Sequence, residues 1–166
     1  MTEISMTISE QKMLEKCCEI ELLCKELYEY FAELYADNEE AVHLWRKTAS
    51  EEQNHADQFV LALKLKKGLA CLVTVDLTKA EWVISQLHTV IEKVKVSPPR
   101  YEDALNSSIK LEKYLAEFHL GCVVAFEDKS CKAMFNAMMA SDQEHIASLQ
   151  AAADKLAGVQ DWTFTA

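Results

Sequence analysis

The sequence is poor in the residues that interrupt helices. Only three glycines and two prolines occur among 166 residues, and half of the chain is apolar. Glycine and proline are the residues least favourable inside a helix, so few positions force the backbone to turn. We therefore expect an all-α protein. A chain of this length builds one hydrophobic core, which favours a single domain over residues 1–166.

Clusters of basic residues and long apolar runs are also missing. The net charge is -10, with 27 acidic and 17 basic side chains. Nucleic-acid binding depends on clustered lysine and arginine, so no nucleic-acid partner is expected. No apolar stretch approaches the roughly 20 residues of a membrane helix, and residues 1–12 lack the basic and apolar segments of a secretion signal. We expect a cytoplasmic protein without a membrane partner.

No Cys-x-x-Cys pair occurs among the six cysteines, which stand at positions 17, 18, 24, 71, 122 and 131. This absence excludes a zinc ribbon or a rubredoxin-type iron site. Because no secretion signal is present, reduced cysteines packed as small apolar residues are favoured over disulfides. Cys24 and Cys122 lie near the level of the acids described below and could be oxidisable, although core packing is the favoured interpretation.

Caps and turn residues predict a first helical hairpin. The segment TISE, from Thr7 to Glu10, is a capping box that opens a helix running to about residue 36. An Asp-Asn pair at 37–38 then supplies the turn and the next N-cap. A second helix follows over about residues 39–67 and is stopped by a glycine. The very short turn predicts that the two helices are antiparallel.

A long crossover and a second hairpin follow. Residues 69–100 contain a further capping box at Thr78 and a helix of about fifteen residues before a Ser-Pro-Pro segment. Helices are then predicted over about residues 101–120, ending near Gly121, and about 128–157; the tail could dock or fray. Two hairpins joined by a long crossover are typical of one class of four-helix bundle. An irregular array of the same helices is the alternative.

Each long helix carries one carboxylate on its apolar face. At heptad spacing Glu21 shares a row with Leu14 and Tyr28, and the corresponding acids of the other helices are Glu52, Glu112 and Asp142. Burying a bare carboxylate costs several kcal/mol, roughly, and four facing one another also repel. Protonation, buried basic partners or metal ions could compensate. No lysine or arginine shares these rows near the acids, which favours metal.

The spacing of these acids repeats in both hairpins. Glu21 and Glu52 are equidistant from the first turn, and the two acids of the second hairpin are equidistant from residue 127. Each pair should therefore stand at one height. A histidine follows the second acid of each hairpin by three residues, namely His55 and His145. Acid and histidine then share one helix face, and an oxygen-rich, thiol-free set favours two iron or manganese ions.

Neighbouring acids are interpreted differently. Glu40 stands three residues before His43, but about 120° around the helix from the proposed ligands, so this pair is expected to be solvated. Glu51 and Glu144 also point away from the predicted core face. We expect both to be solvated, in preference to contacting a ligand.

The pattern resembles that of the ferritin-like di-iron carboxylate proteins, and within them the rubrerythrin-like group. The stretches ELLCKELYEYFAELYA and LWRKTASEEQNHADQFV are similar to the first hairpin of the rubrerythrin iron domain, including Tyr28 seven residues after the first glutamate. The similarity is close over about residues 8–67 and looser over 101–157. It implies a ferritin-like four-helix bundle with two irons, or manganese. The expected metal ligands are Glu21, Glu52, His55, Glu112, Asp142 and His145.

Two positions depart from the rubrerythrin pattern. Asp142 replaces a glutamate, which shortens the side chain by one methylene, and Leu115 stands where rubrerythrins proper have an additional glutamate. The rubredoxin-like module is absent as well. The peroxidase activity of rubrerythrins therefore does not transfer directly to this chain.

The resemblance implies an oxidoreductase that reacts with O₂ or hydrogen peroxide and is re-reduced by an external electron donor, in the context of oxidative stress. It also implies a homodimer. A non-catalytic iron-binding or sensing protein and a metal-free interaction scaffold are the alternatives. Tyr28 and His119, each one heptad after an acid, could contact a ligand or a metal-bound species, or pack in the core.

Overall fold

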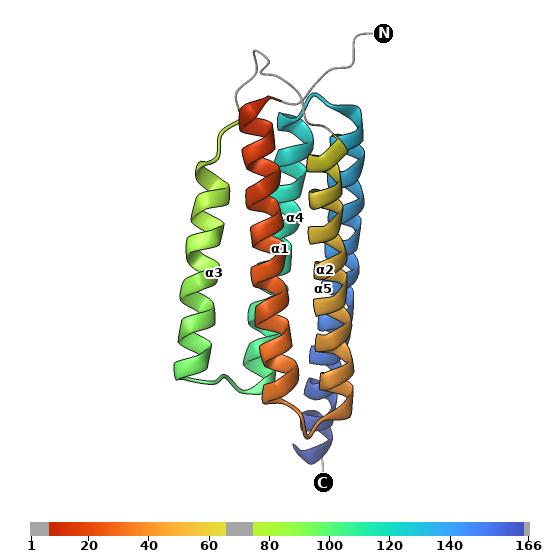
Figure 1. The fold of residues 1–166 in the computed structure, drawn as a ribbon. Helices are drawn as coiled ribbons and strands as arrows, with labels where there is room; N and C mark the ends of the chain where they lie inside the picture. Colours follow the sequence, from red (N-terminus) through yellow and green to blue (C-terminus); the bar gives the residue numbers. More distant parts are fainter. Residues whose placement is uncertain (1–6, 66–74, 165–166) are drawn as a thin grey trace.

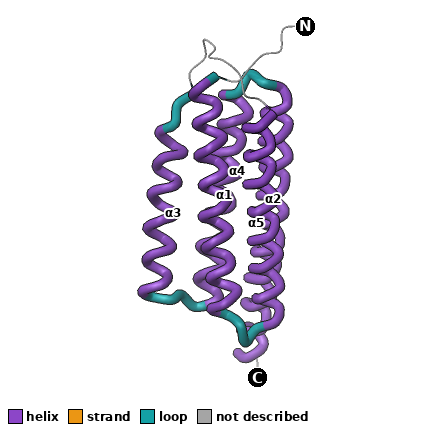
Figure 2. Tube along the Cα trace, in the orientation of Figure 1, coloured by secondary structure: helices purple, strands orange, loops and turns teal. Residues whose placement is uncertain are grey.

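The structure is a computed structural model that describes residues 7–65 and 75–164, with side chains up to residue 158. These residues form helices and no strand (Figure 2), which confirms the all-α prediction. In chain order the helices are α1 Ile8–Leu34, α2 Glu39–Leu65, α3 Thr78–Val96, α4 Tyr101–Ala125 and α5 Lys129–Phe164. None of the described helices has the length and hydropathy that a membrane crossing requires.

Side-chain caps begin three of the helices. The Thr7 hydroxyl accepts a hydrogen bond from the Glu10 N–H at 3.0 Å, and the Glu10 carboxylate accepts one from the Thr7 N–H at 2.8 Å. The predicted capping box is therefore confirmed. Asn38 accepts from the Ala41 N–H at 3.1 Å at the start of α2, and Asp128 accepts a similar bond of 2.8 Å at the start of α5. These bonds satisfy N–H groups that the helix itself leaves open.

Replacing Thr7 with alanine is expected to lower the free energy of unfolding by about 1 kcal/mol, because the buried N–H of Glu10 loses its acceptor. Urea unfolding followed by circular dichroism measures this loss. Thr89→Ala is the matched control, since Thr89 is exposed in the middle of α3 and should change stability by less than about 0.5 kcal/mol. Equal losses in the two variants would contradict a capping role.

The predicted capping box at Thr78 is wrong. Thr78 is the first residue of α3, and its own N–H donates to the Asp76 carboxylate at 2.9 Å. The preceding acid thus organises this helix start through a local turn. The crossover helix is also longer than expected, with 19 residues.

Two predicted helix ends are also wrong. α4 continues through Gly121 to Ala125, and α5 continues through Gly158 to Phe164, so the tail extends the helix. No described glycine has a positive φ. Beyond Gly121 the side chains of Cys122 and Phe126 are buried, and this burial offsets the cost of about 1 kcal/mol for a glycine inside a helix. The predicted end of the second helix and Cys71 lie outside the described residues.

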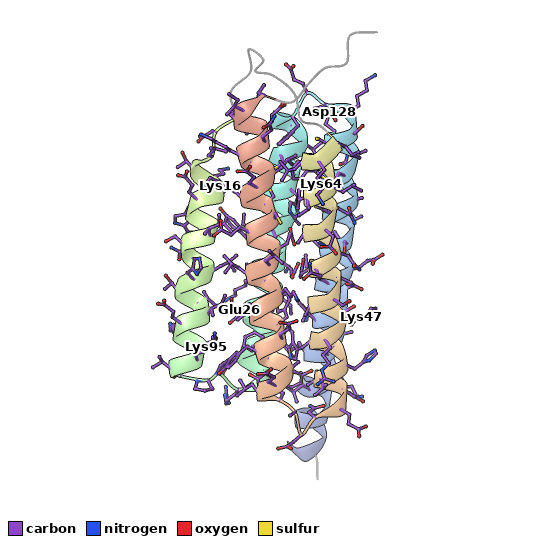
Figure 3. The ribbon with its side chains drawn as sticks, viewed as in Figure 1. Lys16, Glu26, Lys47, Lys64, Lys95 and Asp128 are labelled. Atoms are coloured by element: carbon purple, nitrogen blue, oxygen red, sulfur yellow. The ribbon has the colours of Figure 1, made fainter. Side chains whose placement is uncertain are left out.

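The helices lie lengthwise beside one another (Figure 1). α1 packs mainly on α2, and α4 mainly on α5, so the two hairpins predicted from the sequence are present. α3 runs along α1 at the side of the bundle. Ion pairs join these two helices at Lys16–Glu81 (3.5 Å) and Lys95–Glu26 (3.0 Å); Figure 3 labels Lys16, Glu26 and Lys95 where α3 and α1 run side by side. One apolar core contains residues from all five helices.

Candidate metal centre

Five of the six predicted ligands meet in the interior of the bundle. They form two groups, Glu21 with Glu52 and His55, and Glu52 with Glu112 and His145, in which one donor atom per residue lies within 4.8 Å of the others. All five side chains are buried. Glu52 belongs to both groups, so the two sets of donors share one carboxylate.

The contacts join helices at one level of the bundle. The Nδ1 atom of His55 lies 3.1 Å from an oxygen of Glu52 and 3.5 Å from one of Glu21, across the first hairpin. The Nδ1 atom of His145 lies 3.3 Å from oxygens of both Glu52 and Glu112, so it connects the second hairpin to the first. These distances match the equal heights expected from the spacing about each turn.

Asp142 is buried nearby but belongs to neither group. Its Oδ2 atom lies 2.6 Å from Nδ1 of His119, and the other ring nitrogen of His119 lies 3.2 Å from Glu21. The fully buried imidazole of His119 therefore occupies the space between these two acids. From the sequence, two alternatives remained for His119, contact with a ligand and packing in the core. The signal that pointed to His119 was its position seven residues after Glu112.

Several carboxylate oxygens of the centre lack a hydrogen-bond partner. Both oxygens of Glu21 and Oε1 of Glu52 are buried without a hydrogen bond of adequate geometry among the described residues. An unsatisfied buried carboxylate is costly, and a cation bound between the acids would satisfy these oxygens. Oxygen donors with one or two imidazoles suit iron or manganese. The residues present therefore fit the metal pair expected from the sequence.

The acids and histidines shift one another's protonation. Burial alone would lower the pKa of His55, but the carboxylates of Glu21 and Glu52 raise it to about 10. Burial likewise opposes protonation of His145. The carboxylates of Glu112 and Glu52 nevertheless raise the pKa of His145 to about 11. Burial and the charge of Glu21 raise the pKa of Glu52 well above its usual value. Without metal, protons therefore neutralise part of the buried charge.

Tyr28 contacts the centre from one heptad beyond Glu21. Its hydroxyl donates a hydrogen bond to Oε1 of Glu112, and its ring stacks on Trp45 with centroids 5.4 Å apart. Burial and the charge of Glu112 raise the pKa of Tyr28 well above its usual value. The hydroxyl therefore stays protonated and orients one oxygen of Glu112. This favours the ligand-contact alternative for Tyr28.

The prediction that Glu51 is only solvated is wrong. Its carboxylate lies within hydrogen-bond distance of Nε2 of His145 and is half-buried. Glu51 lies on α2, and α5 packs against this helix, which brings His145 of α5 to Glu51. Glu144, by contrast, is exposed as expected.

A polar pocket of about 310 Å³ reaches the centre between α2 and α5. Its lining includes Glu51, His55 and Glu144. Because His55 belongs to the first ligand group, this pocket connects that group to the surface. It is wide enough for water or a small oxidant.

The pair Glu40 and His43 is exposed, as predicted, and Glu40 binds Lys155 at 2.6 Å. It therefore has the acid-x-x-His spacing without the burial. The same spacing forms a candidate site at Glu52 and His55 only because those side chains face other acids.

Comparison of this chain with protein-family models, with curated proteins and with solved structures finds no match. The resemblance to rubrerythrins thus stays a hypothesis that depends on the residues and contacts described above.

Proposed function

We propose that this protein is a dinuclear metal carboxylate oxidoreductase with a ferritin-like four-helix arrangement, and that iron is its metal. The observation that carries the proposal is the pair of buried Glu-Glu-His groups that share Glu52. Two adjacent donor sets with a common carboxylate suit two metal ions a few Å apart. Manganese is the alternative metal, since the donors are oxygen and nitrogen without sulfur.

The protein side chains have distinct roles in this proposal. Glu52 supplies a donor to both metal positions, while His55 and His145 each hold one position. Glu21 and Glu112 complete the two groups. The hydrogen bond from Tyr28 and the contact of Glu51 with His145 orient two of these ligands, which is how partners of ligands tune a metal site.

Two ferrous ions would supply two electrons to O₂ or hydrogen peroxide, the small oxidants that the pocket beside His55 can admit. The buried carboxylates would balance the positive charge of the two ions. An external electron donor is then needed to restore the ferrous state. A protein that holds iron for binding or sensing uses the same ligands without rapid turnover.

A metal-free scaffold is the second candidate. Its supporting observation is that His119 lies 2.6 Å from Asp142 and 3.2 Å from Glu21, which offers the acids a positive partner without metal. Three buried imidazoles face four buried carboxylates in this way. Metal content distinguishes the two candidates.

The proposal predicts that anaerobic addition of Fe(II) loads about two irons per chain, and that peroxide then oxidises them rapidly. Stopped-flow absorbance and metal analysis after desalting measure rate and stoichiometry. Tight binding with slow oxidation would favour the binding or sensing role. A protein that retains no stoichiometric metal would contradict both metal roles and favour the scaffold.

A further inference from the structure

A second cavity lies between α3 and α4, and α1 forms its third wall. Its volume is about 410 Å³, and its lining includes Leu27 and Phe31 of α1, Leu87 of α3 and Leu111 of α4. Sites for small organic ligands typically have volumes of about 300–1,000 Å³ and mostly apolar walls. None of the proposed metal ligands lines this cavity. It is therefore a candidate binding site separate from the metal centre.

The cavity is long and narrow. At one end the rings of Trp82 and Tyr114 lie with centroids 5.5 Å apart, and at the other end Pro99 of the loop between α3 and α4 belongs to the lining. From Trp82 to Ser97 the lining runs about 22 Å along α3, at 1.5 Å per residue. Trp82 is 52% exposed, so a ligand can enter from solvent. This shape fits an extended alkyl chain.

A buried hydroxyl group belongs to this cavity and has no partner. Ser108 of α4 lines the cavity and is 2% exposed, and its Oγ atom lacks a hydrogen bond among the described residues. Helical serine and threonine can donate to the carbonyl four residues earlier, as Thr48 and Thr89 do at 2.8 and 3.1 Å. An unpaired buried hydroxyl is unfavourable. A ligand oxygen that accepts a hydrogen bond from Ser108 would satisfy it.

The charge of the lining favours an anion. Lys93 of α3 is exposed, and it is the one charged residue among the described residues that line the cavity. The whole chain has a net charge of -10, so a cavity that offers a lysine and no acid differs from the rest of the molecule. A local positive charge attracts an anionic ligand.

Lys93 and Ser108 can act on one group of a ligand. The contact between Trp82 and Tyr114 sets the register of α3 and α4, which run in opposite directions (Figure 1). Ser108 is therefore level with residue 88, and Lys93 lies five residues further, about 8 Å along the axis. Helical side chains lean toward the N-terminus of their own helix, so in antiparallel helices these two lean toward each other.

We propose that this cavity binds an anionic amphiphile, namely a straight-chain carboxylate of the medium-chain fatty acid type. The carboxylate accepts a hydrogen bond from Ser108 and pairs with Lys93. The alkyl chain lies between Leu87 and Leu111 and extends toward Trp82. Burial of the chain supplies most of the affinity, while the two polar groups fix its orientation. This binding site does not depend on the proposed function.

Calorimetric titration of metal-free protein with octanoate, below its micelle concentration, tests the proposal. We expect saturable binding of one octanoate per chain and no measurable binding of acetate, which has the charge without the chain. The neutral probe 1-octanol has the chain without the charge, and it is used with the variants. Because the protein is free of metal, the result is independent of whether the metal centre exists.

Variants separate the two polar contacts. Lys93→Met should weaken octanoate binding about fivefold and leave 1-octanol binding unchanged, since only the charge is lost. Lys110→Met, at an exposed lysine of α4 outside the lining, is the matched control and should bind octanoate normally. Ser108→Ala should weaken octanoate about tenfold without lowering the melting temperature of the ligand-free protein, because the lost hydroxyl has no partner.

Two results would overturn the proposal. One is octanoate binding of equal affinity in Lys93→Met and the unsubstituted protein, which would remove the carboxylate from this cavity. The other is the absence of saturable octanoate binding. If the protein also self-associates, and Trp82→Ala abolishes that association, a second copy of the chain covers the cavity instead.

Discussion

Replacing Glu52 with glutamine is expected to weaken metal binding at both positions, by about 100-fold or more. Glu52 is the one residue common to the two donor groups. The amide keeps the size of the side chain but removes the negative charge that both metals would contact. Burial already raises the pKa of Glu52, so the neutral amide resembles its protonated form and the fold should be retained. Metal analysis after anaerobic Fe(II) loading and desalting measures the loss.

Glu40→Gln is the matched control for this variant. Glu40 lies on the same helix and has a histidine three residues later, but it is exposed and bound to Lys155. The Glu40→Gln variant should bind as much metal as the protein without a substitution. Full metal content in Glu52→Gln would refute the assignment of Glu52, and an equal loss in both variants would indicate an effect of net charge alone.

Replacing Phe135 with alanine is expected to lower the free energy of unfolding by about 3–5 kcal/mol. Phe135 is fully buried on α5 next to the candidate centre. Its ring centroid lies 5.0 Å from that of Phe126, 5.6 Å from Phe59 and 6.1 Å from His119. Deleting the ring leaves a cavity between side chains of α2 and of α4 with its C-cap residue, which cannot collapse without moving His119. Urea unfolding of the metal-free protein gives the value.

Two further variants calibrate the effect at Phe135. Val124→Ala, at a side chain that is 78% exposed, should change stability by no more than about 0.5 kcal/mol. Phe135→Leu keeps most of the volume and should cost about 1.5 kcal/mol or less. If Phe135→Ala lowers the free energy of unfolding by less than Phe135→Leu does, the ring does not pack as described.

Local sequence signals predicted where helices begin better than where they end. Caps such as Thr7 and Asn38 act on N–H groups within one turn, so the signal and its effect lie in the same few residues. Gly121 was expected to end α4, because glycine is a poor helix former. The helix continues because Cys122 and Phe126, beyond it, bury side chains against other helices. That stabilisation depends on residues distant in the sequence.

In the candidate centre, too, local patterns predicted some residues and tertiary packing decided the others. Heptad phase and the spacing about each turn were sufficient to select Glu21, Glu52 and His55, since these depend on helix geometry and hairpin symmetry alone. Glu51 was misassigned because it lies off the face that packs on α1. Its contact with His145 arises only where α5 packs against α2.

The sequence by itself thus determined an all-α chain with two helical hairpins and one acid on the inner face of each long helix, because periodicity and capping are local properties. Only the tertiary structure decided that Glu52 serves two donor groups and that His119 lies between Glu21 and Asp142. The reason is physical. Which side chains touch across a bundle depends on how the helices rotate and approach one another, and that is set by the packing of the whole core.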